Sequence, residues 1–442
     1  MKLKIINRIL CISLIFIFTF TTFYSYSKVY GKTYYVNNAA FNDNLIFSAS
    51  SSPDLCLYAR YAAVIDGGNN RLLFGKNEDT KVPMASTTKI MTCIIALENA
   101  PENLCCTTSS LASSMPEVKL FAKEGEKFSL IDMLYSLMLK SHNDTAVIIA
   151  ENVAKYILNE KNKINTSDYS SSDFVKYFVE LMNNKAKDLG CTSTYFITPN
   201  GLDAKDDNGI HSTTAYDLCK IMSYCINNDR FLRITQTIEY SFNSDKSSYT
   251  ITNANTFLNM YPNIISGKTG FTCDAGYCYV CAYKDDDRTF ICAVLASGWP
   301  NNKSYKWKDT KKLLDYARNN YKKTLVLSKD ENPDPYIYSY GYEEKYVQPR
   351  LNLNENIYYE LCENDKVNIL YTIYPVLSEI YPGDVIGQVN IFINDYLYES
   401  VQLLSDTYIG TPGYIYYIKY CLSRIFSCIF RSNGKLIPLE TG

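Results

Sequence analysis

The chain has 442 residues, of which 47% are hydrophobic and 20% are charged, a globular composition with a length that suggests two or three domains. Its 44 basic residues are offset by 46 acidic ones, and the formal net charge of −2 argues against bulk binding of nucleic acid. Only two histidines, His142 and His211, occur. This argues against a zinc site built on several histidines and restricts a Ser-His-Asp triad to one of these two.

The N-terminal residues have the organisation of an export signal. Three basic residues among the first eight precede an apolar run over 9–23, and small or polar residues follow. The run is short for a membrane span, so a cleaved signal peptide over 1–31 is favoured over a retained membrane anchor. The protein is therefore predicted to be exported, with a linker over 32–54 before the folded part.

A predicted β-hairpin leads into a helix that carries a serine and a lysine. Residues 62–65 and 71–74 are apolar, and 66–70 between them has the residue types of a tight turn. A proline then precedes the stretch with Ser86 and Lys89, which are one helical turn apart. An apolar run follows, so both side chains are expected on one face at the start of a buried helix.

The buried position gives Lys89 a possible chemical role. Burying a charged amine is costly, and that cost lowers its pKa and makes it a candidate base for the Ser86 hydroxyl. The Ser-x-x-Lys pattern occurs three times in the chain, however, and most such pairs are helix caps or solvated charges. The pattern alone therefore leaves a plain N-cap as the alternative.

Further helices are predicted from apolar residues at helical spacing and from capping residues. They are 129–139 with Ser129 as N-cap, a helix from about Asp144, 173–190 ending at Gly190, 212–227 capped near Ser212, and 301–321. A short polar loop, 140–144, joins the first two. Two β-like runs, 272–283 and 288–297, follow the segment 265–272.

The two β-like runs contain cysteines whose spacing allows two interpretations. Cys273, Cys278, Cys281 and Cys292 match the plant-type iron–sulfur pattern, but they also fit strands in which small apolar thiols pack. Because an exported cluster would be unusual, packed thiols are favoured here and for most of the fifteen cysteines. No metal or organic cofactor is expected.

The C-terminal quarter changes in character. Residues 326–349 are polar and read as a linker, and 350–406 contains three β-like runs that predict a small all-β domain. In 407–442, polar residues recur every four positions along an otherwise apolar and aromatic segment. This pattern predicts an amphipathic helix lying on a membrane surface, with packing against the β domain as the alternative.

Three short motifs occur in one order along the chain. Ser86-Thr87-Thr88-Lys89 comes first, Ser141-His142-Asn143 second, and Lys268-Thr269-Gly270 third. The ordered set resembles the signature of penicillin-binding proteins and serine β-lactamases. Over roughly 55–320 the chain is similar to the low-molecular-mass D-alanyl-D-alanine carboxypeptidases, through stretches such as SLIDMLYSLMLKSHNDTAVIIAE and HSTTAYDLCKIM.

The resemblance implies a fold. It is an α/β (α+β) penicillin-binding/β-lactamase-like transpeptidase fold, with an antiparallel sheet flanked by helices, over 55–325. The small all-β domain follows this catalytic domain.

The resemblance also implies roles for the motif residues. Ser86 is the nucleophile and Lys89 its base, with Lys268 as a second cation that lowers the pKa of Lys89. Ser141 relays a proton to the leaving amine, and Asn143 holds Lys89 and the substrate amide. The third motif and the residue after it bind substrate: Lys268 and Thr269 hold its terminal carboxylate, Gly270 completes the motif, and the N–H of Phe271 forms an oxyanion hole with that of Ser86.

The implied activity is removal of the terminal D-alanine from peptidoglycan stem peptides that end in D-Ala-D-Ala, through an acyl-enzyme that β-lactams also form. The implied place is the extracellular face of the cytoplasmic membrane, with the C-terminal helix on the membrane surface and no nucleic-acid partner. Two alternatives remain open: a class A-like β-lactamase, for which Glu180 and Asn184 have a suitable spacing, and a non-catalytic penicillin-sensing or wall-binding protein. His142 stands where many relatives carry glycine and is expected to point away from the nucleophile, while His211 is read as structural.

Overall fold

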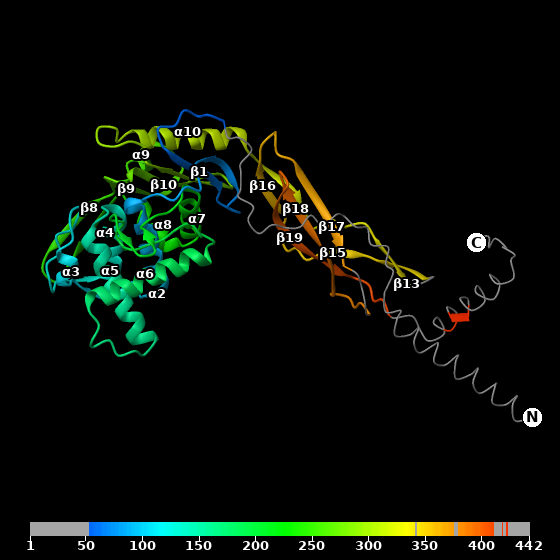
Figure 1. The fold of residues 1–442 in the computed structure, drawn as a ribbon, viewed down its shortest axis with the longest axis horizontal. Helices are drawn as coiled ribbons and strands as arrows, with labels where there is room; N and C mark the ends of the chain where they lie inside the picture. Colours follow the sequence, from blue (N-terminus) through cyan, green and yellow to red (C-terminus); the bar gives the residue numbers. More distant parts are fainter. Residues whose placement is uncertain (1–52, 341–342, 375–378, 411–417, 419–420, 423–442) are drawn as a thin grey trace, which may run out of the picture. The chain divides into compact units, whose positions relative to one another are not determined.

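The computed structural model describes residues 53–340, 343–374, 379–410, 418 and 421–422 (Figure 1). These residues form two compact units. The first comprises the described residues up to Lys323 together with Tyr359–Glu363, and the second comprises the other described residues from Thr324 onward. The predicted signal peptide 1–31, nearly all of the linker 32–54 and most of the segment 407–442 lie outside the described residues, so those expectations stay predictions.

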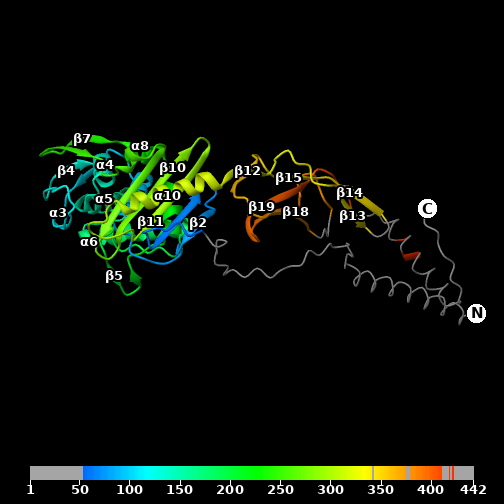
Figure 2. The ribbon, with the colours of Figure 1, turned by 90° about the horizontal axis from the view of Figure 1, so that it is seen from above.

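A five-stranded antiparallel sheet forms the centre of the first unit (Figure 2). In order across the sheet, its strands are β2 (Leu72–Lys76), β1 (Tyr61–Asp66), β11 (Arg288–Leu295), β10 (Gly276–Asp285) and β9 (Ile264–Thr272). The predicted hairpin is present as β1 and β2, and the two β-like runs are β10 and β11.

Both faces of this sheet are buried, which explains its nearly continuous apolar sequence. Successive strand residues point to opposite faces, so Ala63 and Ile65 of β1 enter one core while Ala62 and Val64 enter the other. One face is covered by most of the helices and the other by α10, as Figures 1 and 2 show. The helical elements are η1 (Ala85–Thr88), α2 (Lys89–Asn99), α3 (Ser110–Ser113), α4 (Leu130–Leu139), α5 (Asn143–Tyr156), the π-helical turn η2 (Ile157–Lys161), α6 (Ser171–Asp188), α7 (Ala215–Cys225), α8 (Asp229–Gln236), α9 (Phe257–Met260) and α10 (Tyr305–Asn320).

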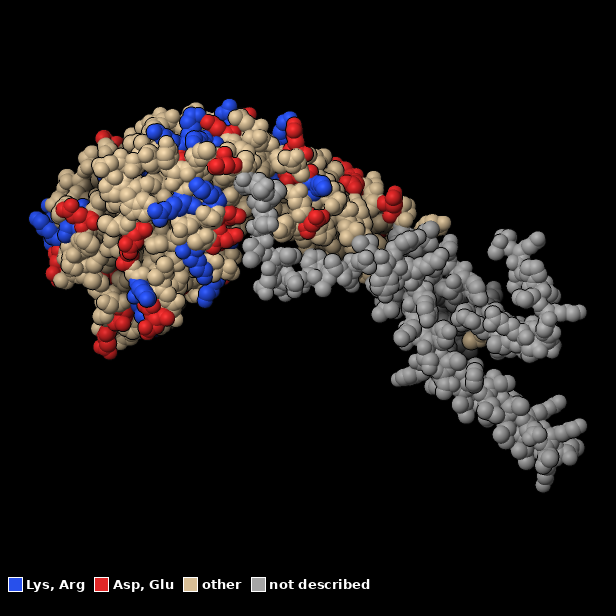
Figure 3. Space-filling model, turned by 45° about the horizontal axis from the view of Figure 1, so that its top comes forward, with Lys and Arg blue, Asp and Glu red and all other residues tan. Residues whose placement is uncertain are grey.

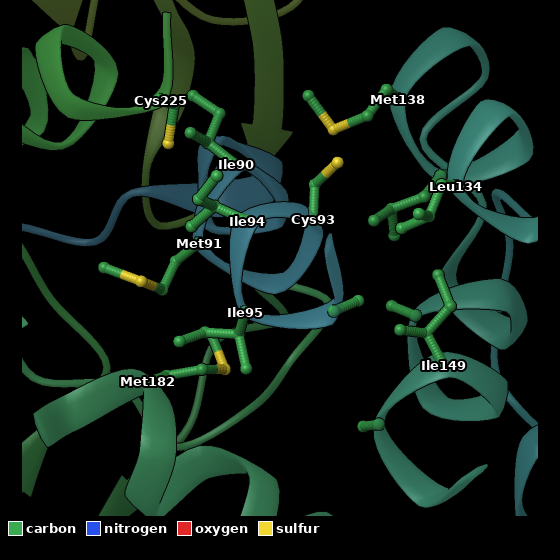
Figure 4. Close-up of a cluster of buried hydrophobic side chains, with 14 of the residues drawn as sticks. Ile90, Met91, Cys93, Ile94, Ile95, Leu134, Met138, Ile149, Met182 and Cys225 are labelled. Carbon is green, nitrogen blue, oxygen red and sulfur yellow. The ribbon is translucent and has the colours of Figure 1, made fainter. Parts of the chain in front are cut away.

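Helix α2 lies at the centre of the larger core (Figure 4). It is apolar nearly all round, as expected of a helix without a solvent face. Its labelled side chains meet neighbours from α4, α5, α6 and α7: Leu134 and Met138, Ile149, Met182, and Cys225. Packing on all sides fixes the position and rotation of α2, and therefore also of the turn η1 that precedes it.

The helix ends test the capping predictions. The Ser129 side chain accepts a hydrogen bond from the backbone N–H of Asp132, which confirms the predicted cap of α4. The predicted cap of α7 near Ser212 is wrong by two residues, because Thr214 is the residue that accepts from the third position of the helix. The backbone of Ser212 instead pairs with Tyr195 in an isolated β-bridge.

Smaller two-stranded pairs also occur among the described residues. They are β3 (Cys105–Thr107) with β4 (Lys127–Ser129), β5 (Lys205–Asp206) with β6 (Gly209–Ile210), β7 (Glu239–Asn243) with β8 (Ser248–Thr252), and β12 (Lys322–Leu327) with β16 (Ile357–Leu361). The β7–β8 hairpin was not expected from the sequence.

The cysteines of the main sheet pack as thiols. Cys278 belongs to the core that contains α2, whereas Cys281 and Cys292 pair directly across strands on the opposite face. Cys273 is exposed beyond the end of β9. Thiols on opposite faces of a sheet cannot converge on one cluster, so the iron–sulfur alternative is excluded. Every cysteine that the structure describes is a free thiol.

The second unit is built from β-strands. A four-stranded sheet has the order β15 (Pro349–Leu351), β19 (Tyr396–Ser405), β18 (Val385–Ile393) and β17 (Val367–Ile373), and a hairpin pairs β13 (Tyr336–Tyr340) with β14 (Glu343–Val347). Asn394 and Asp395, both with positive φ, turn the chain between β18 and β19. The range predicted as a linker, 326–349, contains the β13–β14 hairpin. In the described part of the chain, no helix has the length and apolar character needed to cross a bilayer.

Candidate active site

Basic and acidic side chains are interspersed over the face of the molecule that Figure 3 shows. Two lysines of the sequence motifs are absent from the surface altogether, since Lys89 is 0% and Lys268 2% exposed. Both belong to the first unit. Buried cations without a fully compensating ion pair are costly, so their surroundings define the candidate site.

The turn η1 presents Ser86. Ala85 has a φ of +50°, which turns the chain sharply before the helix. The hydroxyls of Thr87 and Thr88 then donate to the carbonyls of Met84 and Ala85 at 2.6 and 2.8 Å. Ser86 is partly exposed although its neighbours on both sides are buried. The first turn of this helix therefore holds one accessible hydroxyl in a fixed backbone.

The amine of Lys89 is surrounded by oxygen atoms. Its Nζ lies 2.8 Å from Ser86 Oγ, 2.9 Å from Asn143 Oδ1 and 2.6 Å from the backbone oxygen of Asn200. Asn143 Oδ1 and the Asn200 carbonyl can only accept, whereas a hydroxyl can also donate. A neutral amine has two hydrogens and one lone pair, so this arrangement suits a neutral Lys89 that accepts from Ser86.

Electrostatics favour that neutral form. Burial lowers the pKa of Lys89 well below its usual value, and the charge of Lys268 lowers it further, while Asp144 opposes the shift. Burial also lowers the pKa of Lys268, to about 7. Desolvation penalises the charged form of an amine, which is the direction needed for a base.

The Ser141-His142-Asn143 motif lies in the loop between α4 and α5. Asn143 starts α5, and its backbone and side-chain N–H groups donate to the carbonyls of Val118 at 2.7 Å and Pro116 at 3.2 Å. Ser141 has a φ of +67°, and its buried Oγ has no hydrogen-bond partner among the described residues. Its hydroxyl is thus not committed to any other group in the described part of the chain.

The ring of His142 is engaged with α4. Its Nδ1 lies 2.8 Å from Ser136 Oγ, whose hydroxyl is also 3.0 Å from that of Thr145. Burial, with the charges of Lys89, Lys140 and Lys268, lowers the pKa of His142 to about 4. A side chain held in this way is a poor candidate for the base that acts on Ser86.

Strand β9 brings the third motif against η1. A Cβ on Gly270 would lie 2.9 Å from the backbone N of Ser86 and 3.1 Å from that of Thr87, closer than side-chain atoms normally approach. Lys268 Nζ donates to the carbonyl of Thr269 at 2.9 Å. Phe271 is 39% exposed, and its ring contacts that of Tyr277. Only a glycine lets the strand approach the turn η1 this closely.

The structure thus brings most of the predicted residues together. Asn143 contacts Lys89 directly, Gly270 contacts the backbone at Ser86, and Lys268 is close enough to shift the pKa of Lys89. Ser141 follows α4 two positions before Asn143. Thr269 and Phe271 are placed by β9.

One functional contact was missed by the sequence reading. The backbone oxygen of Asn200 binds Lys89, and it belongs to a turn that Thr92 anchors through a 2.6 Å bond to the Pro199 carbonyl. Gly201 has a φ of +84°, and a Cβ there would lie 2.1 Å from the Ala85 carbonyl. The Pro-Asn-Gly sequence signals a turn, but a backbone contact leaves no side-chain signature.

The two residues whose spacing suits a β-lactamase lie on the surface of a helix. Glu180 and Asn184 both lie within α6 and are exposed on its surface. They are one helical turn apart in a solvent-facing position rather than in a loop. In the described part of the chain, no group of three or more histidine, cysteine, aspartate or glutamate residues could hold a metal ion.

Comparison with known proteins supports one family. The family model described as D-alanyl-D-alanine carboxypeptidase matches residues 48–161 and 169–298. The chain is 27% identical to the D-alanyl-D-alanine carboxypeptidase DacF of Bacillus subtilis over 274 residues, 61% of this chain and 64% of that protein. It is 29% identical to the D-alanyl-D-alanine carboxypeptidase of a Streptomyces species, strain K15, over 61% of this chain and 90% of that protein. The chain therefore spans less than two thirds of the Bacillus relative.

Solved structures support the fold. The Streptomyces K15 DD-transpeptidase matches with a TM-score of 0.52 at 28% identity, over 60% of this chain and 98% of that one. DacD of Francisella tularensis, at 21% identity, matches in fold with a TM-score of 0.58 over 86% of this chain and all of that one. The predicted fold class, a sheet flanked by helices and followed by a small β domain, is confirmed.

Proposed function

The chain belongs to the D-alanyl-D-alanine carboxypeptidase family, as its sequence predicts, and on that premise we propose that it is a serine carboxypeptidase of peptidoglycan. It removes the terminal D-alanine from stem peptides that end in D-Ala-D-Ala. The observation that carries the proposal is the 2.8 Å contact between Lys89 Nζ and Ser86 Oγ, in a buried site that favours the neutral amine.

Acylation begins at the hydroxyl of Ser86. Its Oγ attacks the carbonyl carbon of the penultimate D-alanine, and the lone pair of Lys89 Nζ takes the hydroxyl proton. The negative charge on the substrate oxygen is stabilised by the backbone N–H groups of Ser86 and Phe271. The C–N bond then breaks, and the proton passes through Ser141 to the nitrogen of the departing D-alanine.

Hydrolysis completes the cycle. A water molecule attacks the ester carbonyl while Lys89 accepts its proton, and that proton returns to Ser86 Oγ as the shortened peptide leaves. Asn143 holds the amine of Lys89 for both steps and the substrate amide for the first. No proton acceptor other than Lys89 is required.

The third motif selects the substrate. Lys268 and Thr269 bind the carboxylate of the terminal D-alanine, as a cation and a hydroxyl can. Gly270 permits the close approach of β9 to the nucleophile, so the carboxylate and the scissile carbonyl are held by adjacent groups. Penicillins carry a carboxylate beside a reactive amide, so the same groups would position them for acylation of Ser86.

The proposed place of action is outside the cytoplasm. The N-terminal sequence supports export, and the basic, amphipathic 407–442 supports attachment to the membrane surface. The enzyme would then face the cell wall from the outer side of the cytoplasmic membrane.

A pentapeptide ending in D-Ala-D-Ala tests the function. The wild-type protein is expected to release D-alanine and to retain a fluorescent penicillin at Ser86 for minutes, while Ser86→Ala does neither. Labelling without any D-alanine release would favour a penicillin sensor, and rapid penicillin turnover without a stable adduct would favour a β-lactamase. Because Glu180 is exposed on α6, rapid penicillin turnover is the less expected of these two results.

A further inference from the structure

His211 is buried beside the turn η1 that carries Ser86. The sequence predicts a structural role for it. It is 2% exposed and precedes α7. Its Nε2 lies 2.8 Å from the hydroxyl of Thr88, the residue next to Lys89. Because buried polar groups are normally hydrogen-bonded, the partners of its two nitrogen atoms show which segments the ring connects.

The hydrogen bonds of the ring determine which nitrogen carries the proton. The backbone N–H of Ile197 donates to Nδ1 at 2.9 Å, and that of Thr198 points to the same atom at 3.4 Å. Nδ1 is therefore an acceptor, so the proton is on Nε2, which donates to Thr88 Oγ1. The hydroxyl of Thr88 in turn donates to the carbonyl of Ala85 at 2.8 Å.

The neutral ring is also the electrostatically favoured one. Burial lowers the pKa of His211 to about 4, and the charge of Lys89 contributes in the same direction. An imidazolium would lose the lone pair that accepts from Ile197. The observed geometry and the burial therefore agree on one tautomer.

This ring connects the two segments between which Lys89 is held. On one side is η1, with Ala85 before the nucleophile and Thr88 after it. On the other side is the loop 197–201. The carbonyl of Asn200 in this loop lies 2.6 Å from Lys89 Nζ and 3.5 Å from Ser86 Oγ. The two segments are in contact, because a Cβ on Gly201 would overlap the Ala85 carbonyl.

We propose that His211 is a positioning residue for acylation of Ser86, acting through Thr88 and the loop 197–201, and this rests on the function proposed above. It touches neither substrate nor reacting atoms. Its effect is to keep the Asn200 carbonyl against the amine of Lys89, which directs the lone pair of that amine toward Ser86. A displacement of about 1 Å at a reacting group can slow a reaction about a hundredfold.

Two substitutions remove the connection from opposite ends. Thr88→Val keeps the shape and removes the hydroxyl that accepts from Nε2. His211→Asn keeps an acceptor near the position of Nδ1 and removes the Nε2 donor. The measured quantity is the rate at which fluorescent penicillin acylates Ser86, normalised to the fraction of molecules that label at completion.

Each single variant is expected to acylate about ten- to a hundredfold more slowly than wild type. The double variant is expected to be no slower than the slower single one, because both changes break the same connection. With the pentapeptide, kcat should fall while KM changes little, since neither residue contacts substrate. Thr88→Ser, which keeps the hydroxyl, should recover to within about threefold of wild type.

A matched control separates positioning from general stability. Thr166→Val also removes a hydroxyl from a mostly buried threonine, one that donates to Asn159 at 2.7 Å, and should acylate at the wild-type rate.

Acylation of both single variants within about twofold of wild type, at any melting temperature, would overturn the proposal. A double variant whose acylation is slowed by the product of the two single effects would also overturn the proposal. If His211→Asn does not fold, the acylation rates of Thr88→Val and Thr88→Ser are compared, and equal rates would overturn the proposal. A wild-type protein that is not acylated at all would instead contradict the proposed function itself.

Discussion

The two units of the molecule differ in how far apart in the sequence their key segments lie. In the second unit, β17, β18 and β19 are neighbours both in sequence and in the sheet, so local turns suffice to join these three strands. In the first unit, η1 meets β9 and the turn at Asn200, which are far from it in sequence. The candidate chemistry lies where distant segments converge, because only such a site can enclose a lysine and still surround it with oxygen atoms from several elements.

The largest effect is expected from replacing the enclosed amine itself. Lys89→Met keeps the length of the side chain and removes the base, so D-alanine release should fall at least about a thousandfold. The buried oxygens of Asn143 and Asn200 lose their partner, so a modest fall in melting temperature is expected that leaves the protein folded. The rate and the thermal transition of the same preparation check this together. A variant that keeps a tenth of the wild-type rate would show that another group serves as base.

A smaller effect is expected from the glycine that lets β9 approach the nucleophile. Gly270→Ala should reduce kcat about a hundredfold, because its Cβ would displace the backbone at Ser86. Gly383→Ala in the second unit is the matched control: it introduces the same methyl group where no heavy atom lies within 4 Å, at a φ of +95°. That change should lower stability modestly and leave kcat unaltered. Equal losses of kcat in both variants would remove the contrast between the two units.

The charge of Lys268 should give a pH effect on KM of up to about tenfold for each pH unit above about 7. Its pKa of about 7 lies below the ordinary value, so the side chain is charged below pH 7 and neutral above it. The KM for a peptide with a terminal carboxylate should therefore rise above about pH 7, up to about tenfold per pH unit. Lys268→Met should raise KM at low pH and flatten this dependence. A KM that stays level to pH 9 in the wild type would contradict the assignment.

The same shift has a consequence for stability. A lysine whose pKa is lowered on folding binds fewer protons in the folded than in the unfolded chain between about pH 7 and its usual value of 10.5. Stability contributed by this site should therefore rise with pH across that window. Denaturant unfolding of wild type and Lys268→Met at pH 7 and pH 9 measures the difference, which the substitution should reduce.

The smallest effect on catalysis is expected at the far end of the chain. Removing 407–442 should change the rate on a soluble pentapeptide by less than about twofold while abolishing association with anionic phospholipid vesicles, because the basic stripe would be lost. Sedimentation with vesicles of phosphatidylglycerol, compared with vesicles of phosphatidylcholine, measures the binding. Full retention of binding by the shortened chain would exclude this segment as the attachment.

The sequence predicted much of this molecule where local signals are strong. The β1–β2 hairpin and the Ser129 cap each depend on residues close together in the chain. The three motifs could be predicted because each carries an unusual combination of side chains. Their convergence was implied by the family resemblance, not by the pattern of any single segment.

What the sequence could not predict depends on backbone atoms and on distant packing. The Asn200 carbonyl contributes no side chain to a motif, yet it makes the shortest contact to Lys89. The bond between His211 and Thr88 joins residues on separate elements, and nothing local indicates it. The cap of α7 was predicted near Ser212, and Ser212 and Thr214 are both good N-cap residues. The backbone of Ser212 pairs with Tyr195, and Thr214 is the cap.

The protonation state of Lys89 tests the account most directly. Nitrogen-15 NMR of lysine-labelled protein, with Lys89→Met to identify the signal, reports whether each Nζ is an ammonium or an amine as pH changes. The account predicts that Lys89 is an uncharged amine at pH 7, because burial and Lys268 both lower its pKa. A signal that remains an ammonium up to pH 10 would contradict the proposed base.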